Sequence, residues 1–513
     1  MEKISSDLKF VLICTIVFFI LTLFNILHHE MWRDELEAWM IVRDAVSIQA
    51  LIENLQYQGH TMLWHLILYP VTKITRNPAA MQMSHLLIAT LTAFVFLKFA
   101  PFSRLLKVLF IFGYFPFFEF ASISRNYAIG ILLLFIFCAC FGRDFKSRNY
   151  IILSLVLLLM CQCNALSTVL AIALAATVFL EPVLVRDFSV YKSRQFYVSV
   201  LIFLAGLILS IVQMIPPADS LVYKPKLIPF DMSGKVVDQI SALWNVFFPV
   251  PRIELTFWGS NFITYLPLKE YTVSALRFVA SLWLLLLTTG IIFRKKIPAF
   301  YYIAAIAGVT AFSYIFYEGY LRHKAHYYFA FISALWISAY YRNEEFKSRF
   351  FNRFFSFFEK TKSYFLFVVL SLGVIAGLIA NSLDYRYPFS ACKAAAAFIK
   401  QNNLQNMHIA GHMDYTSSGV SAYLDKPFYY PISDRTGTFT VWNSKRSEKT
   451  DVLKAIKKYR DSVKADVLLV FNDPPKMNKI LQYRLIPVTK IMQSTVRDEN
   501  FFLYLMRYEK EPV

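Results

Sequence analysis

The stretch that decides the fold is HHEMWRDELEAWMIVRD, residues 28–44, which follows a run of twenty residues, 8–27, whose only charged member is Lys9. A run of about 20 apolar residues is long enough to cross a bilayer as a helix. Residues 28–44 then place seven acidic or histidine side chains directly behind that run: His28, His29, Glu30, Asp34, Glu35, Glu37 and Asp44. The pattern predicts a first span that ends in a polar loop at one membrane face.

The composition of the whole chain supports a membrane protein. Hydrophobic residues make up 57% of the 513 residues, above the 45–50% that is typical of soluble domains. The 30 Tyr, 50 Phe and 8 Trp suit two lipid interfaces, where amphipathic rings lie at headgroup depth. The formal net charge of +19 could indicate a nucleic-acid partner, but the Lys and Arg residues fall between apolar runs and do not form one basic stripe. We expect no nucleic-acid partner.

Eleven runs approach the ~20 residues that a helix needs to cross a bilayer. They cover residues 8–27, 79–98, 105–122, 126–142, 150–166, 167–185, 196–215, 271–293, 298–317, 326–341 and 363–382. A further apolar segment, 61–75, is short and carries His65, Pro70 and Lys73. Its placement decides the topology of everything that follows.

Positive charge places this segment, because short cytoplasmic loops collect Lys and Arg. If 61–75 does not span, every basic connection falls on the same side as Lys3. Those connections are Lys98, Arg104 and Lys107; Arg143, Lys146 and Arg148; Arg186, Lys192 and Arg194; Arg294, Lys295 and Lys296; and the long segment 342–362. We therefore predict an interfacial helix at 61–75 within an external loop, and a cytoplasmic N-terminus.

This topology leaves two long external loops, 28–78 and 216–270, within a membrane domain of residues 1–382. From residue 383 the pattern changes. The segments CKAAAAFIKQNN and DVLKAIKKYRDSV are typical of helices, and MHIAG, FTVWN, ADVLLVF and NFFLYLMRY are typical of strands. The predicted fold is therefore mostly α-helical and polytopic, with about eleven transmembrane helices and a small α/β domain, residues 383–513, outside the cytoplasm.

The acidic loop is the first candidate site. Asp34 and Glu35 are adjacent, so on a helix their side chains point about 100° apart. Asp34 and Glu37 are three residues apart and share one face. One carboxylate can thus face a cleft while its neighbour holds the segment in place. The alternative is an acidic interfacial helix that is simply solvated.

Two further polar spots are expected at the same face. FPFFEFASISRNYAIG, residues 115–130, places Glu119 and Arg125 at the ends of two short spans, where unpaired charges are costly. An ion pair between them that closes the turn is the structural alternative. YEGYLRHKAHYY, residues 317–328, offers Arg322 and His323, and an arginine fork matches the geometry of a phosphate. Together the three spots suit transfer of a group from a lipid phosphate, with a carboxylate as base and cations on the leaving phosphate.

The sequence resembles the GT-C superfamily of polytopic glycosyltransferases, in particular the bacterial members related to protein O-mannosyltransferases and the lipid A aminoarabinose transferase. The resemblance rests on four short motifs and on the architecture beyond residue 185. The motifs are Trp32-Arg33-Asp34-Glu35 with Ala38-Trp39 and Arg43-Asp44; Gly59-His60 with Leu63-Trp64; Ser124-Arg125-Asn126-Tyr127-Ala128; and Arg322-His323.

The resemblance implies an inverting glycosyltransferase that takes its sugar from a polyprenyl-phosphate donor, with Asp34 as general base and Glu35 as its catalytic neighbour. The residues expected to bind substrate are Glu119, Arg125, Tyr127, His60, Arg322 and His323. The chain departs from the family pattern at Thr61, where proline often follows Gly-His, and at Glu119, where aspartate is common. The acceptor stays open between a glycan, a lipid and a protein.

No metal site and no cofactor are predicted. His28, His29, Asp34, Glu35 and His60 are suitable ligand types for a divalent metal, but their spacing matches no compact ligand motif. A flippase or transporter of lipid-linked glycans is the competing function, as is another lipid-dependent envelope transferase. A transporter would carry ionisable groups near mid-membrane, whereas the centres of these spans hold almost none. The expected location is the bacterial inner membrane, with the C-terminal domain in the periplasm.

Overall fold

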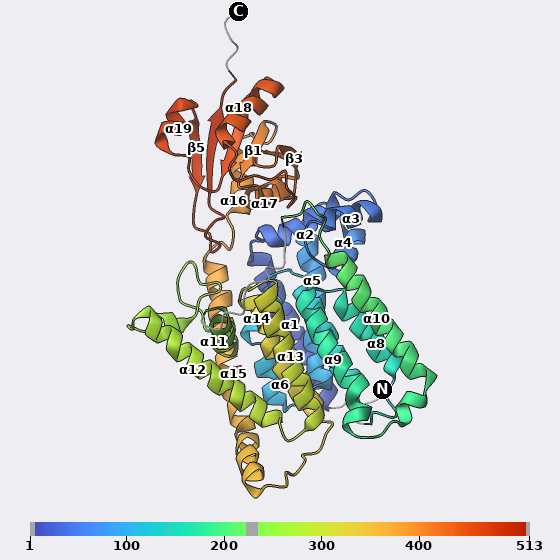
Figure 1. The fold of residues 1–513 in the computed structure, drawn as a ribbon. Helices are drawn as coiled ribbons and strands as arrows, with labels where there is room; N and C mark the ends of the chain where they lie inside the picture. Colours follow the sequence, from blue (N-terminus) through green and yellow to red (C-terminus); the bar gives the residue numbers. More distant parts are fainter. Residues whose placement is uncertain (1–5, 143, 222–233, 509–513) are drawn as a thin grey trace, which may run out of the picture.

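The computed structural model describes residues 6–142, 144–221 and 234–508. Two parts follow one another along the long axis of the molecule (Figure 1). The first is a bundle of helices, and the second is a compact domain of strands and helices, drawn in orange and red, at one end of the bundle. The long helix α15, Arg349–Arg386, runs from beneath this domain through the bundle to the opposite end.

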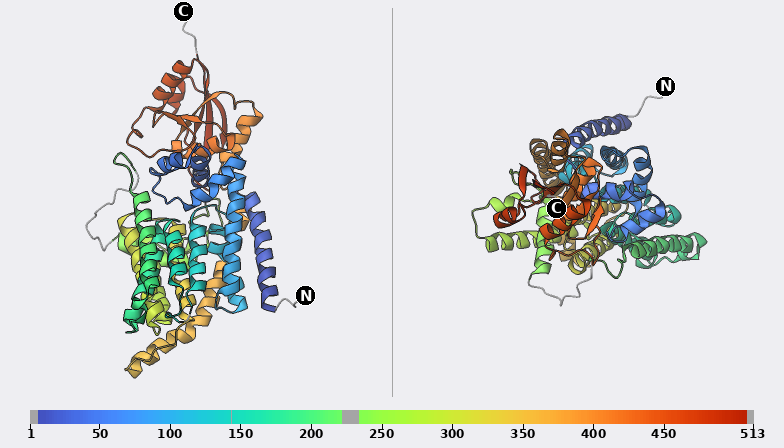
Figure 2. Two further views of the ribbon diagram at one scale, coloured as in Figure 1. Left: turned by 90° about the vertical axis from the view of Figure 1, so that its right-hand side faces the viewer. Right: turned by 90° about the horizontal axis from the view of Figure 1, so that it is seen from above.

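Seven helices of the described chain are long and apolar enough to cross a membrane. They are α1 (Ser6–His28), α5 (Ala79–Phe99), α9 (Ala165–Leu184), α10 (Arg194–Met214), α12 (Glu270–Ile292), α13 (Lys296–Ile315) and α15. Two shorter apolar helices, α7 (Tyr127–Cys140) and α8 (Tyr150–Cys161), run beside them (Figure 2). The predicted polytopic membrane architecture is confirmed, but the count of eleven spans is not.

The segment expected to span at 105–122 is not one continuous helix. It divides into α6 (Arg104–Ile111) and a π-helical turn, η1 (Phe115–Glu119), which α15 approaches closely. A Cβ atom on Gly377 would lie only 3.1 Å from the Phe112 carbonyl oxygen. Glycine at 377 therefore permits α15 to pack closely against the segment that joins α6 to η1. The interruption brings Glu119 to the end of the bundle at which the compact domain sits.

The first long loop folds into three short helices at that end: α2 (Arg33–Arg43), α3 (Ile48–Leu55) and α4 (Leu63–Ile74). Helix α2 turns Leu36, Trp39 and Met40 inward, and none of these side chains is exposed. Residues 63–74 are helical, as expected; that α4 lies at a membrane interface stays a prediction. Residues 222–233 of the second long loop, which include Pro225 and Pro229, lie outside the described residues. The described remainder of the loop contains a helix that the sequence did not predict, α11 (Lys235–Phe247), and a short turn, η3 (Phe262–Tyr265).

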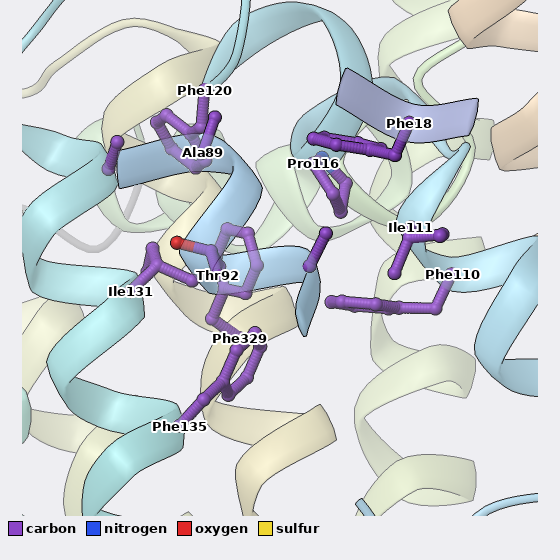
Figure 3. A pocket seen from close by; sticks show the side chains of 12 residues that line it. Phe18, Ala89, Thr92, Phe110, Ile111, Pro116, Phe120, Ile131, Phe135 and Phe329 are labelled. Carbon is purple, nitrogen blue, oxygen red and sulfur yellow. The ribbon is translucent and has the colours of Figure 1, made fainter. Parts of the chain in front are cut away.

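Helix α14 (Leu321–Ser338) is the most enclosed helix of the bundle, with sixteen of its eighteen residues buried. It packs against α7, α11 and α13. A small apolar cavity of about 20 Å³ lies among α1, α5, α6, η1, α7 and α14 (Figure 3). Its lining includes Phe18, Phe110, Phe135 and Phe329, and Thr92 carries a polar atom beside it. Such a space is a packing void with no polar cluster.

The C-terminal domain has one six-stranded mixed sheet in the order β3-β2-β1-β4-β6-β5. Strand β1 is parallel to β2 and β4, whereas β3, β5 and β6 pair with their neighbours in antiparallel fashion. The strands are β1 (His408–His412), β2 (Phe428–Tyr430), β3 (Arg435–Gly437), β4 (Val467–Phe471), β5 (Ile486–Ile491) and β6 (Phe501–Met506); the helices are α16 (Cys392–Gln401), α17 (Asp414–Leu424), α18 (Val452–Val463) and α19 (Met477–Gln482). The small α/β domain is confirmed.

One expected strand is wrong. Residues 439–443, FTVWN, form an irregular segment in which Asn443 makes a single isolated bridge to Ser220. Thr440 of this segment accepts a hydrogen bond from Gln58 through its carbonyl oxygen, at 3.0 Å. Its backbone therefore bonds to the loops of the bundle and does not join the sheet.

The C-terminal domain rests on the first loop. Helix α17 packs on α2, where a Cβ atom added to Gly419 would lie 3.5 Å from a Leu36 methyl group. Arg43 Nη1 lies 2.9 Å from Asp425 Oδ1, and the hydroxyl of Thr438 donates to Asp44 at 2.5 Å. The domain thus covers α2, the helix that carries the acidic motif.

Candidate active site

Asp34 lies in the first turn of α2, and its side chain is 27% exposed. Three arginines surround it. Arg322 Nη2 donates to Asp34 Oδ2 at 3.2 Å, and Arg125 Nη2 lies 3.9 Å from the same oxygen. Arg33 Nε lies 3.9 Å from Oδ1. The structure therefore brings together three residues predicted for the site, Asp34, Arg125 and Arg322, although they belong to distant parts of the chain.

These charges decide the protonation state of Asp34. Burial raises the pKa of a carboxyl group, but the charges of Arg125 and Arg322, with a smaller contribution from Arg33, outweigh it and hold the pKa of Asp34 below its usual value. Asp34 is therefore ionised at neutral pH. In this arrangement it is a weak base, because the same arginines stabilise its charged form.

Arg125 and Arg322 retain unused hydrogen-bonding capacity. Each Nε–H is buried and has no hydrogen-bond partner among the described residues. Arg125 also donates from Nη1 to the backbone carbonyl of Asp34. The side chains are 10% and 5% exposed, so these N–H groups are costly to leave unpaired. Two guanidinium groups around one carboxylate leave an excess of positive charge that suits an anion.

Aromatic rings fix the position of Arg322. Its guanidinium carbon lies 5.1 Å from the ring centroids of Trp32, Trp258 and Tyr320. Cation–π contacts of this kind are strongest where water is excluded. Trp258 comes from the second long loop and was missed by the sequence reading, since a single tryptophan in an irregular segment gives no periodic signal. It is one wall of the site.

Glu119 holds Trp258, one of the three rings around Arg322, and does not pair with Arg125. Its carboxylate is 2% exposed and accepts from Trp258 Nε1 at 3.1 Å and from the Tyr114 hydroxyl at 3.0 Å. The expected alternative, an ion pair between Glu119 and Arg125, is absent from the described contacts, because Arg125 points to Asp34. Glu119 therefore orients the ring that stacks on Arg322.

Glu35 points away from Asp34 into the protein. It is fully buried, and its Oε1 accepts from the backbone N–H of Ser124 at 2.6 Å, directly before Arg125. Its Oε2 accepts from Trp32 N at 3.2 Å and contacts His29 Nε2 at 3.0 Å. Glu35 thus fastens the segment that carries Arg125 to the first turn of α2. The geometry makes it a positioning residue and not a group that faces substrate.

Tyr127 and His323 form a buried pair behind the arginines. The backbone N–H of Tyr320 donates to His323 Nδ1 at 2.9 Å, so a neutral imidazole carries its proton on Nε2, which lies 2.7 Å from the Tyr127 hydroxyl. Gly319, with φ +76°, makes the tight turn before α14, because a Cβ there would lie 2.9 Å from His323. This pair braces the start of α14 next to Arg322.

His60 and Glu37 are half-buried beside Asp34. Burial and the charge of Arg125 lower the pKa of His60 to about 4, so its imidazole is neutral. Burial and the charge of Asp34 raise the pKa of Glu37 to about 8. Glu37 was not among the predicted site residues, although its three-residue spacing from Asp34 indicated a shared face. Across the described residues, no group of three or more His, Cys, Asp or Glu is arranged to hold a metal ion.

This architecture is similar to that of a membrane protein of known structure. ArnT from Cupriavidus metallidurans, in a crystal structure with undecaprenyl phosphate, superposes with a TM-score of 0.53 and covers 98% of each chain at 11% sequence identity. The two proteins share a fold. The predicted fold is thereby confirmed: a polytopic helical bundle followed by a small C-terminal domain. No family model matches the sequence, and no curated protein shows significant similarity to it.

Proposed function

We propose that the chain is a glycosyltransferase that moves a sugar from a polyprenyl-phosphate donor to an acceptor hydroxyl. The observation that carries the proposal is the Asp34 cluster: an ionised, partly exposed carboxylate held between two arginines that keep buried N–H groups without partners. Support comes from the fold shared with ArnT, whose structure contains undecaprenyl phosphate. A lipid phosphate has both the charge and the oxygen geometry for two guanidinium groups.

The proposed step is a single displacement. The acceptor oxygen forms a bond to the anomeric carbon while the bond from that carbon to the phosphate oxygen breaks. Asp34 takes the hydroxyl proton, and the phosphate leaves with the electron pair and its negative charge. Arg125 and Arg322 stabilise that charge, because they lie within contact distance of Asp34 and are already oriented. Attack from the face opposite the phosphate inverts the anomeric centre.

Donor binding also activates the base on this proposal. Without donor, the arginines neutralise Asp34 and depress its pKa. A phosphate that shares the same guanidinium groups withdraws part of this stabilisation, so the pKa of Asp34 rises and its affinity for the acceptor proton increases. The base becomes effective only when the leaving group is in place, which limits idle hydrolysis of the donor.

The location follows from the nature of the donor. Nucleotide sugars are cytoplasmic, and the chain contains no glycine-rich phosphate loop, so a lipid-borne donor fits a site outside the cytoplasm. We propose that residues 1–382 form the catalytic membrane domain and residues 383–513 an extracytoplasmic domain that covers it. The bacterial inner membrane, with a cytoplasmic N-terminus, is the proposed location.

The test is transfer from a panel of radiolabelled polyprenyl-phosphate sugars by the full chain reconstituted in vesicles. The wild type should release polyprenyl phosphate and label an acceptor fraction. Asp34→Asn should lower turnover by about 10²–10⁴-fold, the range for loss of a general base. Glu53→Gln, in an exposed turn of α3, is the matched acidic control. Undiminished turnover in Asp34→Asn would remove Asp34 from the role of base.

A further inference from the structure

The face of α2 that carries Asp34 also carries a second acidic residue, Glu37. Glu37 lies three residues further along the same helix, so its Cβ is about 5–6 Å from that of Asp34. Glu37, like Asp34, is partly exposed. Glu37 Oε1 accepts a hydrogen bond from Gln58 Nε2 at 3.4 Å, and among the described residues neither Arg125 nor Arg322 hydrogen-bonds to Glu37. A polar surface therefore extends from the base toward residues 56–60.

His60 completes this surface. It follows Gln58 in the turn before α4, is half-buried, and is close enough to Asp34 and Arg125 for their charges to act on it. Among the described side-chain hydrogen bonds, none involves a ring nitrogen of His60. Glu37 and His60 thus offer hydrogen-bonding atoms to the open side of the site that the protein itself leaves largely unused.

The C-terminal domain encloses the same surface. Gln58 is 7% exposed, and its Nε2 bridges Glu37 and the Thr440 carbonyl oxygen, the latter at 3.0 Å. Asp414, at the start of α17, is near Glu37 but is neutralised by Arg446, whose Nε lies 3.1 Å from it. The surface therefore lies between the first loop and the C-terminal domain, bounded by polar groups from both.

We propose that Glu37, His60 and Gln58 form the acceptor subsite of the proposed transferase, and that it binds the hydroxyl groups of an uncharged sugar. This inference rests on the proposed function, and it names the acceptor class that the proposal left open. On this proposal, Asp34 accepts the proton of the reacting hydroxyl group. Glu37, one helical turn away, forms a hydrogen bond with a second hydroxyl group of the same sugar ring.

The protonation states favour hydroxyl groups over charged acceptors. Glu37, with a pKa of about 8, is mostly protonated at neutral pH and donates through its O–H; neutral His60 both donates and accepts. Hydroxyl groups likewise donate and accept, so each can be satisfied. With the donor phosphate on Arg125 and Arg322, an anionic acceptor would be repelled by that phosphate and by Asp34. A serine side chain supplies a single hydroxyl and leaves Glu37 or His60 without a partner.

Binding is tested directly, without the donor, by saturation-transfer NMR on the full chain in nanodiscs. The probes are methyl hexopyranosides and methyl pentopyranosides, with N-acetylserinamide and ethanolamine as comparison compounds. Transfer to at least one glycoside, well above the two comparison compounds, is expected. It should fall at least about fivefold in Glu37→Ala and persist in Glu53→Gln, since losing one buried hydrogen-bond partner costs about that much affinity. Equal signals from glycosides and comparison compounds, or no change in Glu37→Ala, would overturn the acceptor subsite.

Kinetics separate a binding role from a catalytic or structural one. With the bound glycoside as acceptor, Glu37→Ala should raise its KM about tenfold, with the Kd for polyprenyl phosphate unchanged. Glu37→Gln, which keeps a donor and an acceptor atom, should raise KM only about threefold. The wild-type KM should rise above pH 8, where Glu37 ionises, and the Gln variant should lose this rise. Equal damage by Gln and Ala would contradict the inference. Glycoside binding without transfer from any lipid donor would instead reject the proposed function.

Discussion

Asp34 and Arg322, 288 positions apart in the sequence, lie 3.2 Å apart in the structure, and the same arginine is stacked against three aromatic rings. The guanidinium group is thus held firmly, whereas the carboxylate is the partly exposed member of the pair. Asp34 therefore contacts the same arginines that the donor phosphate is proposed to bind, so the carboxylate and the phosphate would compete for them.

Removing the charge of Asp34 should strengthen phosphate binding even though it lowers turnover. In Asp34→Asn the arginines no longer neutralise a carboxylate, so polyprenyl phosphate should bind about tenfold more tightly, equivalent to ~1.4 kcal/mol. Equilibrium binding of a labelled polyprenyl phosphate to the protein in nanodiscs measures this change in Kd. The control variant Glu53→Gln, which also replaces a carboxylate by an amide, should leave the Kd unchanged. Weaker binding by the Asn variant would show that Asp34 helps to hold the donor.

Replacing Arg322 by lysine should weaken donor binding even though the charge is kept. The lysine ammonium group is not planar, so it cannot stack on the rings of Trp32, Trp258 and Tyr320 as the guanidinium group does. It also cannot form the paired hydrogen bonds by which a guanidinium group binds a phosphate. We expect the Kd for polyprenyl phosphate to rise about tenfold in Arg322→Lys. The same exchange at exposed Arg497 is the control. If both variants bind like wild type, the phosphate does not contact Arg322.

The sequence predicted the membrane bundle and the C-terminal domain because both rest on local patterns. Long apolar runs and alternating strands are visible in any window of the chain. The span at 105–122 failed because apolar composition does not reveal a break, and here Gly113 and Pro116 accompany a π turn. FTVWN has strand-like residues, but its backbone bonds to the first two loops instead of a neighbouring strand.

The candidate site was predictable only in part, for a related reason. Asp34, Arg125 and Arg322 are charged residues next to apolar spans, and such residues are conspicuous in sequence. Trp258 and Gln58 are not, because their importance depends on contacts with Glu119 and Thr440 across long sequence separations. Adjacent Asp34 and Glu35 looked alike in sequence, and only the packing of α2 separates the exposed carboxylate from the buried one.

Glu119 should act on donor binding through Trp258. In Glu119→Ala the indole N–H loses its acceptor, so the ring can shift away from Arg322. We expect a Kd for polyprenyl phosphate about three- to fivefold higher, because the ring beside Arg322 loses one hydrogen bond of about 1 kcal/mol. Glu119→Gln, which retains a carbonyl acceptor, should recover most of the affinity. If Glu119 contacts the phosphate or the sugar itself, the Gln variant should fail as the Ala variant does.

Stability should depend on pH through His29, which lies between Glu35 and Asp384 at 3.0 and 2.9 Å. Burial lowers the pKa of His29, but the two carboxylates outweigh it and raise the pKa well above 6.5, so the imidazolium persists at neutral pH. A raised folded-state pKa gives stability that is complete below pH 6.5 and declines as pH rises toward the folded value. His29→Gln should lose about 3–5 kcal/mol, since two buried carboxylates then lack their cation.

Thermal unfolding of the full chain in nanodiscs between pH 5 and 9 measures both effects. The Tm difference between the wild type and His29→Gln should be largest at the acidic end and should shrink progressively as the pH rises above neutrality. His28→Gln, at the exposed neighbouring position, should follow the wild-type profile. Because Glu35 also holds the segment before Arg125, the His29 variant should bind polyprenyl phosphate less tightly even at temperatures where it remains folded. An unchanged affinity in folded His29→Gln protein would mean that Glu35 keeps Arg125 in place without its imidazolium partner.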